Sequence, residues 1–120
     1  MTKVVVATKK PFHPDGVKHI RSLAGEAGFQ VSVLEKYDGQ NELANAVKDA
    51  EALIVRSDKV TKEIISSAPR LKIVVRAGAG YDNVDLEAAS EKGVTVMNTP
   101  GQNSNAVAEL TVGLMVYRAR

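Results

Sequence analysis

Five short apolar runs, rich in β-branched residues, recur along the 120-residue chain, with polar or helix-like segments between them. They occupy residues 4–7, 31–34, 52–55, 71–75 and 94–97. Runs of this length and composition are typical of strands buried on both faces, the kind found in parallel sheets. The regular alternation therefore predicts an α/β fold built around a five-stranded parallel sheet.

The segments between these runs, and the last segment of the chain, carry apolar residues at helical spacing. This predicts helices near residues 15–27, 41–50, 61–67, 85–92 and 106–117. Asn41 and Thr61 are predicted N-caps, and Gly28 and Gly93 are predicted to end the helices before them. Short loops and right-handed crossovers predict a doubly wound sheet of strand order 2-1-3-4-5 with helices on both faces. This arrangement is flavodoxin-like (Rossmann-like), in a single domain over residues 1–120.

Ligands of doubly wound sheets bind beyond the carboxyl ends of the strands, so the residues that follow each run are candidates for function. After the third run come Arg56 and Ser57, a guanidinium fork and a hydroxyl that can hold a carboxylate or a phosphate. A solvated arginine beside a turn serine is an equally good interpretation of this pair. A glycine-rich turn follows the fourth run, and residues 98–103 follow the fifth.

The glycine-rich turn reads Arg76-Ala-Gly-Ala-Gly-Tyr-Asp-Asn-Val-Asp85. It partly matches the dinucleotide fingerprint G-x-G-x-x-G, but Asn83 stands where the third glycine should be. The helix that follows opens with Asp85 and Glu87, whose charges repel a pyrophosphate placed there. A turn whose backbone amides, over residues 77–80, face a small carboxylate fits the sequence better.

The composition excludes several classes of function. A net charge of +2, from 16 basic and 14 acidic residues, leaves no footprint for nucleic acid or an anionic membrane. The chain has no cysteine, and no apolar run long enough for a signal peptide or a membrane span. We therefore expect a soluble, cytoplasmic protein. His13 and His19 have no motif partner and the acids show no metal-ligand spacing, so neither a metal site nor a catalytic residue is predicted.

Three stretches resemble the NAD-dependent D-2-hydroxyacid dehydrogenases. They are Ile54-Val-Arg-Ser57, residues 75–86 around the glycine turn, and residues 96–110, which begin Val96-Met-Asn-Thr-Pro-Gly-Gln-Asn103. Within this family they look most like the members that oxidise 3-phosphoglycerate to 3-phosphohydroxypyruvate in serine biosynthesis. The resemblance covers the whole chain, is specific in the last two stretches and is loose over residues 1–50. It implies a reversible hydride transfer between NAD and the C2 of a 2-hydroxy acid.

The resemblance also implies roles for individual residues. Arg56 and Ser57 resemble the pair that holds the carboxylate or phosphate end of the substrate, and an amide nest for the carboxylate follows the fourth strand. Ala79 stands where many relatives have a threonine near the nicotinamide, so a hydroxyl contact to the cofactor is lost. Asn103 resembles a substrate-side asparagine at the start of an interdomain helix, while Arg76 is expected to be structural. The implied substrate-binding residues are Arg56, Ser57, Ala77, Gly78, Ala79, Gly80 and Asn103.

In this family the catalytic arginine, glutamate and histidine and the true NAD-binding fingerprint lie downstream of any residue here. We therefore expect the N-terminal, substrate-binding part of a dehydrogenase, with helix 103–120 leading into a missing NAD domain. Alone it should not catalyse hydride transfer or bind NAD tightly. It should bind its acid at millimolar concentration or more weakly, because one ionic contact is worth about 1.5–3 kcal/mol. The alternative is an engineered or excised flavodoxin-like scaffold without activity.

The last predicted helix, near residues 106–117, is apolar almost all round, so it must be buried on more than one face. It can fold back on the fifth strand, which the length of the preceding loop favours. It can also pack against a second copy of the chain in a homodimer, which its all-round apolarity favours.

Overall fold

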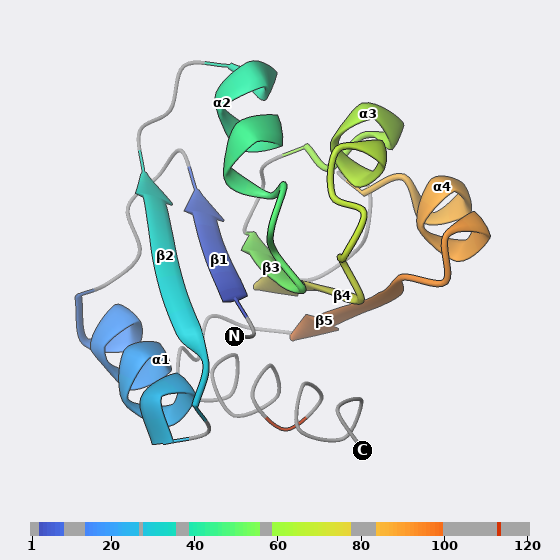
Figure 1. Cartoon of the computed structure of the whole chain (residues 1–120). Coiled ribbons are helices and arrows are strands. Elements are labelled where there is room, and N and C mark those ends of the chain that lie inside the picture. The colour runs from blue at the N-terminus through green and yellow to red at the C-terminus, as the bar shows by residue number, and fades with distance from the viewer. Residues whose placement is uncertain are drawn as a thin grey trace.

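The computed structural model describes residues 3–8, 14–26, 28–35, 39–55, 59–77, 84–99 and 113. Within these ranges the chain forms one parallel sheet of five strands in the order β2-β1-β3-β4-β5 (Figure 1). The strands are β1 (Lys3–Thr8), β2 (Gln30–Glu35), β3 (Ala52–Val55), β4 (Ile73–Ala77) and β5 (Thr95–Thr99). The predicted fold class and strand order are confirmed.

Four helices connect the strands: α1 (Pro14–Glu26), α2 (Gln40–Ala46), α3 (Lys62–Ser66) and α4 (Leu86–Glu91). Figure 1 shows α2, α3 and α4 in a row along one face of the sheet and α1 on the opposite face. The neighbours in the row pack against each other, α2 on α3 and α3 on α4. Helices therefore cover both faces, as expected for a doubly wound sheet. In the predicted last helix the described residue is Gly113, which is helical and exposed.

The helix ends follow the sequence signals with one exception. Thr61 is the N-cap of α3, as predicted, and Gly28 and Gly93 take positive φ angles of 81° and 72° after α1 and α4. The prediction that Asn41 caps the second helix is wrong, because the N-cap is Gly39 and makes no side-chain hydrogen bond. The helix starts one residue before Asn41, whose side chain is therefore inside the first turn.

Two strands also lie later in the chain than the apolar runs that predicted them. The fourth strand runs two residues later than the apolar run, because the Leu71 N–H donates to the Ala68 carbonyl in a turn before the strand begins. It continues through Arg76 and Ala77, and the fifth strand continues to Thr99. Backbone pairing between β4 and β5 extends both strands beyond their apolar residues, with Ala77 opposite Thr99.

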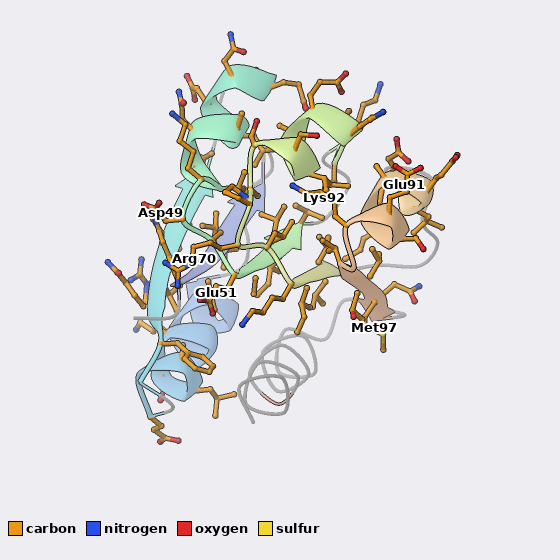
Figure 2. The ribbon with its side chains drawn as sticks, turned by 45° about the vertical axis from the view of Figure 1, so that its right-hand side comes forward. Asp49, Glu51, Arg70, Glu91, Lys92 and Met97 are labelled. Carbon is orange, nitrogen blue, oxygen red and sulfur yellow. The ribbon has the colours of Figure 1, made fainter. Side chains whose placement is uncertain are left out.

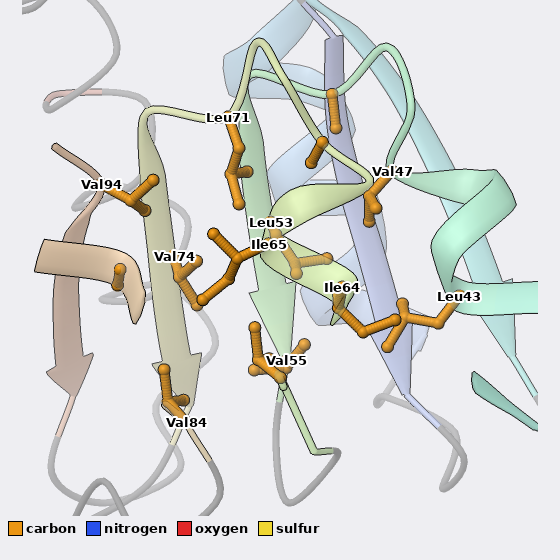
Figure 3. Packing of buried hydrophobic residues seen from close by; sticks show 14 of the residues in the cluster. Leu43, Val47, Leu53, Val55, Ile64, Ile65, Leu71, Val74, Val84 and Val94 are labelled. Carbon is orange, nitrogen blue, oxygen red and sulfur yellow. The ribbon is translucent and has the colours of Figure 1, made fainter. Parts of the chain in front are cut away.

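Alternate residues of the central strands point to opposite faces of the sheet and form two cores. On the α2–α4 face, Leu53, Val55 and Val74 pack with Leu43 and with Ile64 and Ile65 of α3 (Figure 3). On the α1 face, Leu23 of α1 packs with a second cluster of buried side chains: Val4, Val6, Ala52, Ile54, Ile73 and Val75. The run from Val4 to Ala7 is buried throughout, which confirms burial on both faces.

We call the end of the sheet where the strands begin the amino edge, and the end where they finish the carboxyl edge. At the amino edge, one acidic residue bonds to neighbouring strands. Glu51 lies directly before β3 and is 8% exposed. Its carboxylate Oε1 accepts a hydrogen bond from Arg70 Nη2 at 2.9 Å (Figure 2). Its backbone N–H donates to the Lys3 carbonyl, and its own carbonyl accepts from the Lys72 and Ile73 N–H groups. One residue thus joins the starts of three strands.

Candidate functional site

The carboxyl edge between β3 and β4 is where the sequence places the substrate-binding residues. Val55, the last residue of β3, pairs in register with Arg76, one residue before the end of β4. The chain therefore leaves these two neighbouring strands at the same edge. Arg56 and Ser57 follow Val55 directly, and the glycine turn follows Ala77.

Ala77 is the predicted substrate residue that the structure describes. Its backbone closes β4 opposite Thr99 of β5. Arg76 precedes it inside the strand, partly buried and paired with Val55 on one side and Asn98 on the other. His19 lies in α1. The other predicted positions fall outside the described residues: Arg56, Ser57, Gly78, Ala79, Gly80 and Asn103, together with His13.

A second contact joins the two segments that follow β3 and β4. Val60 and Val84 form an isolated parallel β-bridge, and the Asp85 N–H donates to the Val60 carbonyl at 2.9 Å. We call Val60, Val84 and Asp85 the carboxyl-edge clamp. Between the strand ends and this clamp lie residues 56–59, here the β3 loop, and residues 78–83, here the β4 loop. Both loops start on paired strands and end on paired residues.

Helix starts surround the clamp. Thr61 Oγ1 accepts a hydrogen bond from the Ile64 N–H at 3.4 Å, and Asp85 Oδ1 accepts one from the Ala88 N–H at 3.0 Å. From α2, Gln40 Nε2 donates to the Lys59 carbonyl at 3.4 Å. Three helices therefore fix the backbone on which the β3 and β4 loops end.

The clamp was missed at the sequence level, although a signal was present. In both cases a valine stands directly before an N-cap residue, Val60 before Thr61 and Val84 before Asp85. An apolar residue before an N-cap often packs against the fourth helical residue. Here those fourth residues are Ile65 and Ala89, and both share a core cluster with the two valines. The pattern thus predicts each valine to be buried, but not that the valines pair with each other.

A hollow of about 470 Å³ adjoins the clamp, a volume within the range of small-molecule sites. The charges of its described lining are balanced, because two lysines, Lys59 and Lys62, stand with two acids, Glu63 and Asp85. The described lining alone does not favour an anion.

The start of α4 does not fit the pyrophosphate of a dinucleotide. The Asp85 carboxylate occupies the Ala88 N–H, and Glu87 adds a second negative charge to the first turn. A phosphate there would meet like charges at the amides it needs. No step of the chemistry can therefore be assigned to NAD at this helix. Among the described residues, no three or more His, Asp or Glu side chains gather as metal ligands.

Comparison with known proteins gives consistent results. The family model described as "D-isomer specific 2-hydroxyacid dehydrogenase, catalytic domain" matches residues 4–115. The chain is 43% identical over 121 aligned positions to D-3-phosphoglycerate dehydrogenase of Methanocaldococcus jannaschii, covering 100% of this chain and 22% of the relative. It is 44% identical over 92 positions to hydroxypyruvate reductase of Thermotoga maritima, covering 76% of this chain and 30% of that protein.

A solved structure is similar over almost the whole chain. It is the NAD+-bound 3-phosphoglycerate dehydrogenase of Entamoeba histolytica, which superposes with a TM-score of 0.82 at 50% sequence identity. The match covers 97% of this chain and 38% of that one. The chain thus spans about a fifth of the length of the first curated relative and well under half of this solved one.

Proposed function

The chain belongs to the D-isomer specific 2-hydroxyacid dehydrogenase family, and from that premise we propose that it is the substrate-binding part of a D-3-phosphoglycerate dehydrogenase. The whole enzyme would oxidise 3-phosphoglycerate to 3-phosphohydroxypyruvate with NAD. The 120 residues would hold the acid and leave the chemistry to a domain that carries the acid–base groups and the cofactor. The chain alone would therefore be inactive.

The observation that carries this proposal is the double anchoring of the β3 and β4 loops. They leave paired strands at Val55 and Ala77 and end on the paired residues Val60 and Val84. The few residues between these anchors restrict how far apart the two loops can lie. A cation from one loop and backbone amides from the other would then face the same small acid.

Each residue has a proposed role. Arg56 and Ser57 would bind the carboxylate or phosphate end of the acid by charge-assisted hydrogen bonds. The amides of residues 77–80 would bind the carboxylate, and Asn103 would contact the substrate from the following segment. Ala79 would face the nicotinamide supplied by the rest of the enzyme. The cytoplasmic location stays a prediction.

An equilibrium titration followed by amide NMR tests this proposal. We expect millimolar or weaker binding of 3-phosphoglycerate, and weaker binding of glycerate, because glycerate lacks the phosphate charge. Arg56→Ala should weaken binding of 3-phosphoglycerate by about tenfold or more, the value of one charge-assisted contact. Arg21→Ala, which removes an exposed arginine of α1, is the matched control and should change nothing.

Two results would contradict the proposal. Glycerate binding as tightly as 3-phosphoglycerate would favour an unphosphorylated substrate, of the kind named for the Thermotoga maritima relative. No shifts up to tens of millimolar, in the spectrum of a folded protein, would leave the alternative of a scaffold without activity.

The predicted helix 103–120 decides whether the chain is expected to pair with a second copy. Ile54, Ile73 and Val75 are fully buried within a single copy, although the described side chains that pack on their cluster come from α1, β2 and Phe29. This supports a cover supplied by the same chain, and we propose that residues 103–120 supply it. Sedimentation should then show a monomer at high concentration. A dimer would instead support exchange of this helix between two copies.

A further inference from the structure

The carboxyl-edge clamp has features that helix capping alone does not require. A capped helix needs the Asp85 carboxylate on the Ala88 N–H, which is present at 3.0 Å. The Asp85 backbone makes a separate contact, its N–H donating to the Val60 carbonyl at 2.9 Å. Val60 is fully buried and Val84 is 7% exposed, so the bridge lies against the core (Figure 3).

The clamp also links segments that are far apart in the sequence. Residue 60 begins the approach to α3 and residue 84 the approach to α4, and β4 lies between them along the chain. Among the described residues, β3 and β4 pair up to Val55 and Arg76, and the bridge joins the two segments again at residues 60 and 84.

We propose that Val60, Val84 and the Asp85 N–H are positioning residues that set the distance between the β3 loop and the β4 loop. The binding part of this proposal rests on the proposed function, in which these loops hold a phosphorylated 2-hydroxy acid. Two loops that must meet one small acid gain affinity when their separation is fixed before binding.

A set of substitutions at Asp85 separates the clamp from the cap. Asp85→Ala removes the capping carboxylate and keeps the N–H that Val60 needs. Asp85→Pro removes both, and the φ angle of −77° at this position is within the range of proline. Asp85→Ser keeps both and should behave as the parent protein. The difference between the proline and alanine variants therefore isolates the clamp hydrogen bond.

The decisive readout is made without ligand. Asp85→Pro should shift the amide resonances of residues 56–58, which precede Lys59 and Val60 in the sequence, and Asp85→Ala should not. Both should lower the unfolding temperature, since both lose the cap. Equal shifts of residues 56–58 in the two variants would overturn the proposal, whether or not the protein binds 3-phosphoglycerate.

The ligand readout adds a second arm. Where the parent protein binds 3-phosphoglycerate, Asp85→Pro should weaken the affinity by about fivefold or more relative to Asp85→Ala, the value of one hydrogen bond. Equal affinities would contradict the positioning role. Failure of the parent protein to bind would contradict the proposed function, while the ligand-free shifts would still decide the clamp.

A second pair of variants guards against misfolding of the proline variant. Val84 and Val94 are both 7% exposed and belong to the same core cluster. Figure 3 shows Val84 by the arrowhead of β4 and Val94 by the opposite end of the strands. Val84→Ala should shift residues 56–58, and Val94→Ala, which loses the same side-chain volume, should leave them in place. Shifts of equal size in both would overturn the proposal.

Discussion

Different contacts join neighbouring segments at the two ends of the strands. At the amino edge, Glu51 is nearly buried and its carboxylate pairs with Arg70. Its backbone N–H and carbonyl form hydrogen bonds with Lys3, Lys72 and Ile73. At the carboxyl edge, the Val60 and Val84 bridge joins the segments that follow β3 and β4, whose sequences include Arg56 and the glycine turn.

The amino edge is a structural joint. Lys92 Nζ adds to it by donating to the Ile65 carbonyl at 3.2 Å, which ties the end of α4 to the end of α3 (Figure 2). At the carboxyl edge, the starts of α3 and α4 directly follow the Val60 and Val84 bridge, and Gln40 at the start of α2 bonds to the Lys59 carbonyl. Under the proposed function, stability and ligand binding would be assigned to opposite ends of the same strands, as in other doubly wound sheets. Substitutions at each edge should therefore have separable effects.

The largest loss of stability should come from a substitution in the buried central strand, β3. Leu53 of β3 is fully buried, and Leu53→Ala should lower the free energy of unfolding by about 2–5 kcal/mol. Chemical denaturation measures this value. Leu86→Ala is the control, because Leu86 is 46% exposed on α4, and its cost should stay within about 0.5 kcal/mol. Similar losses in the two variants would contradict the assignment of the core.

The next largest loss of stability should come from removing the ion pair at the amino edge. Arg70→Ala leaves the Glu51 carboxylate, 10% exposed, without its ionic partner. Because Arg70 itself is 60% exposed, the expected loss is about 1–3 kcal/mol, below that of a fully buried pair. Affinity for 3-phosphoglycerate should not change at temperatures where the variant is folded. A loss of affinity as large as that of Arg56→Ala would break the distinction between the two edges.

The caps at the carboxyl edge should give the smallest changes in stability. Asp85→Ala should cost about 1 kcal/mol, the usual value of an N-cap. Thr61→Ala should cost less, because its oxygen lies 3.4 Å from the Ile64 nitrogen and the Asp85 oxygen lies 3.0 Å from that of Ala88. Thermal unfolding of the two variants checks the order. The reverse order would show that distance does not set the strength of these caps.

The fold was predictable because local and global signals agree. β-branched runs located the strands, Thr61 located the start of α3, and Gly93 located the end of α4. The cap was misplaced at Asn41 because asparagine is a good capping residue, but it lies two positions after the observed N-cap, Gly39. The fourth and fifth strands were predicted to end too early. Pairing with a neighbour, as between Ala77 and Thr99, extends a strand past its apolar residues.

The site residues stay a prediction, and their framework was not predicted. The rule on carboxyl ends points to the residues after β3 and β4, and of the predicted residues the structure describes Ala77, the last residue of β4. The Val60 and Val84 bridge and the Glu51 and Arg70 pair join residues 24 and 19 positions apart. Local spacing carries no information on such contacts, because they depend on how the strands are ordered in the sheet.

The most direct test of the division between the edges is an amide map of the parent protein during titration with 3-phosphoglycerate. The account predicts shifts at residues 56–58, at Ala77 to Val84 and at Asn103, with Glu51, Arg70 and Lys72 unchanged. Largest shifts at the amino edge, or equal shifts at both edges, would contradict it.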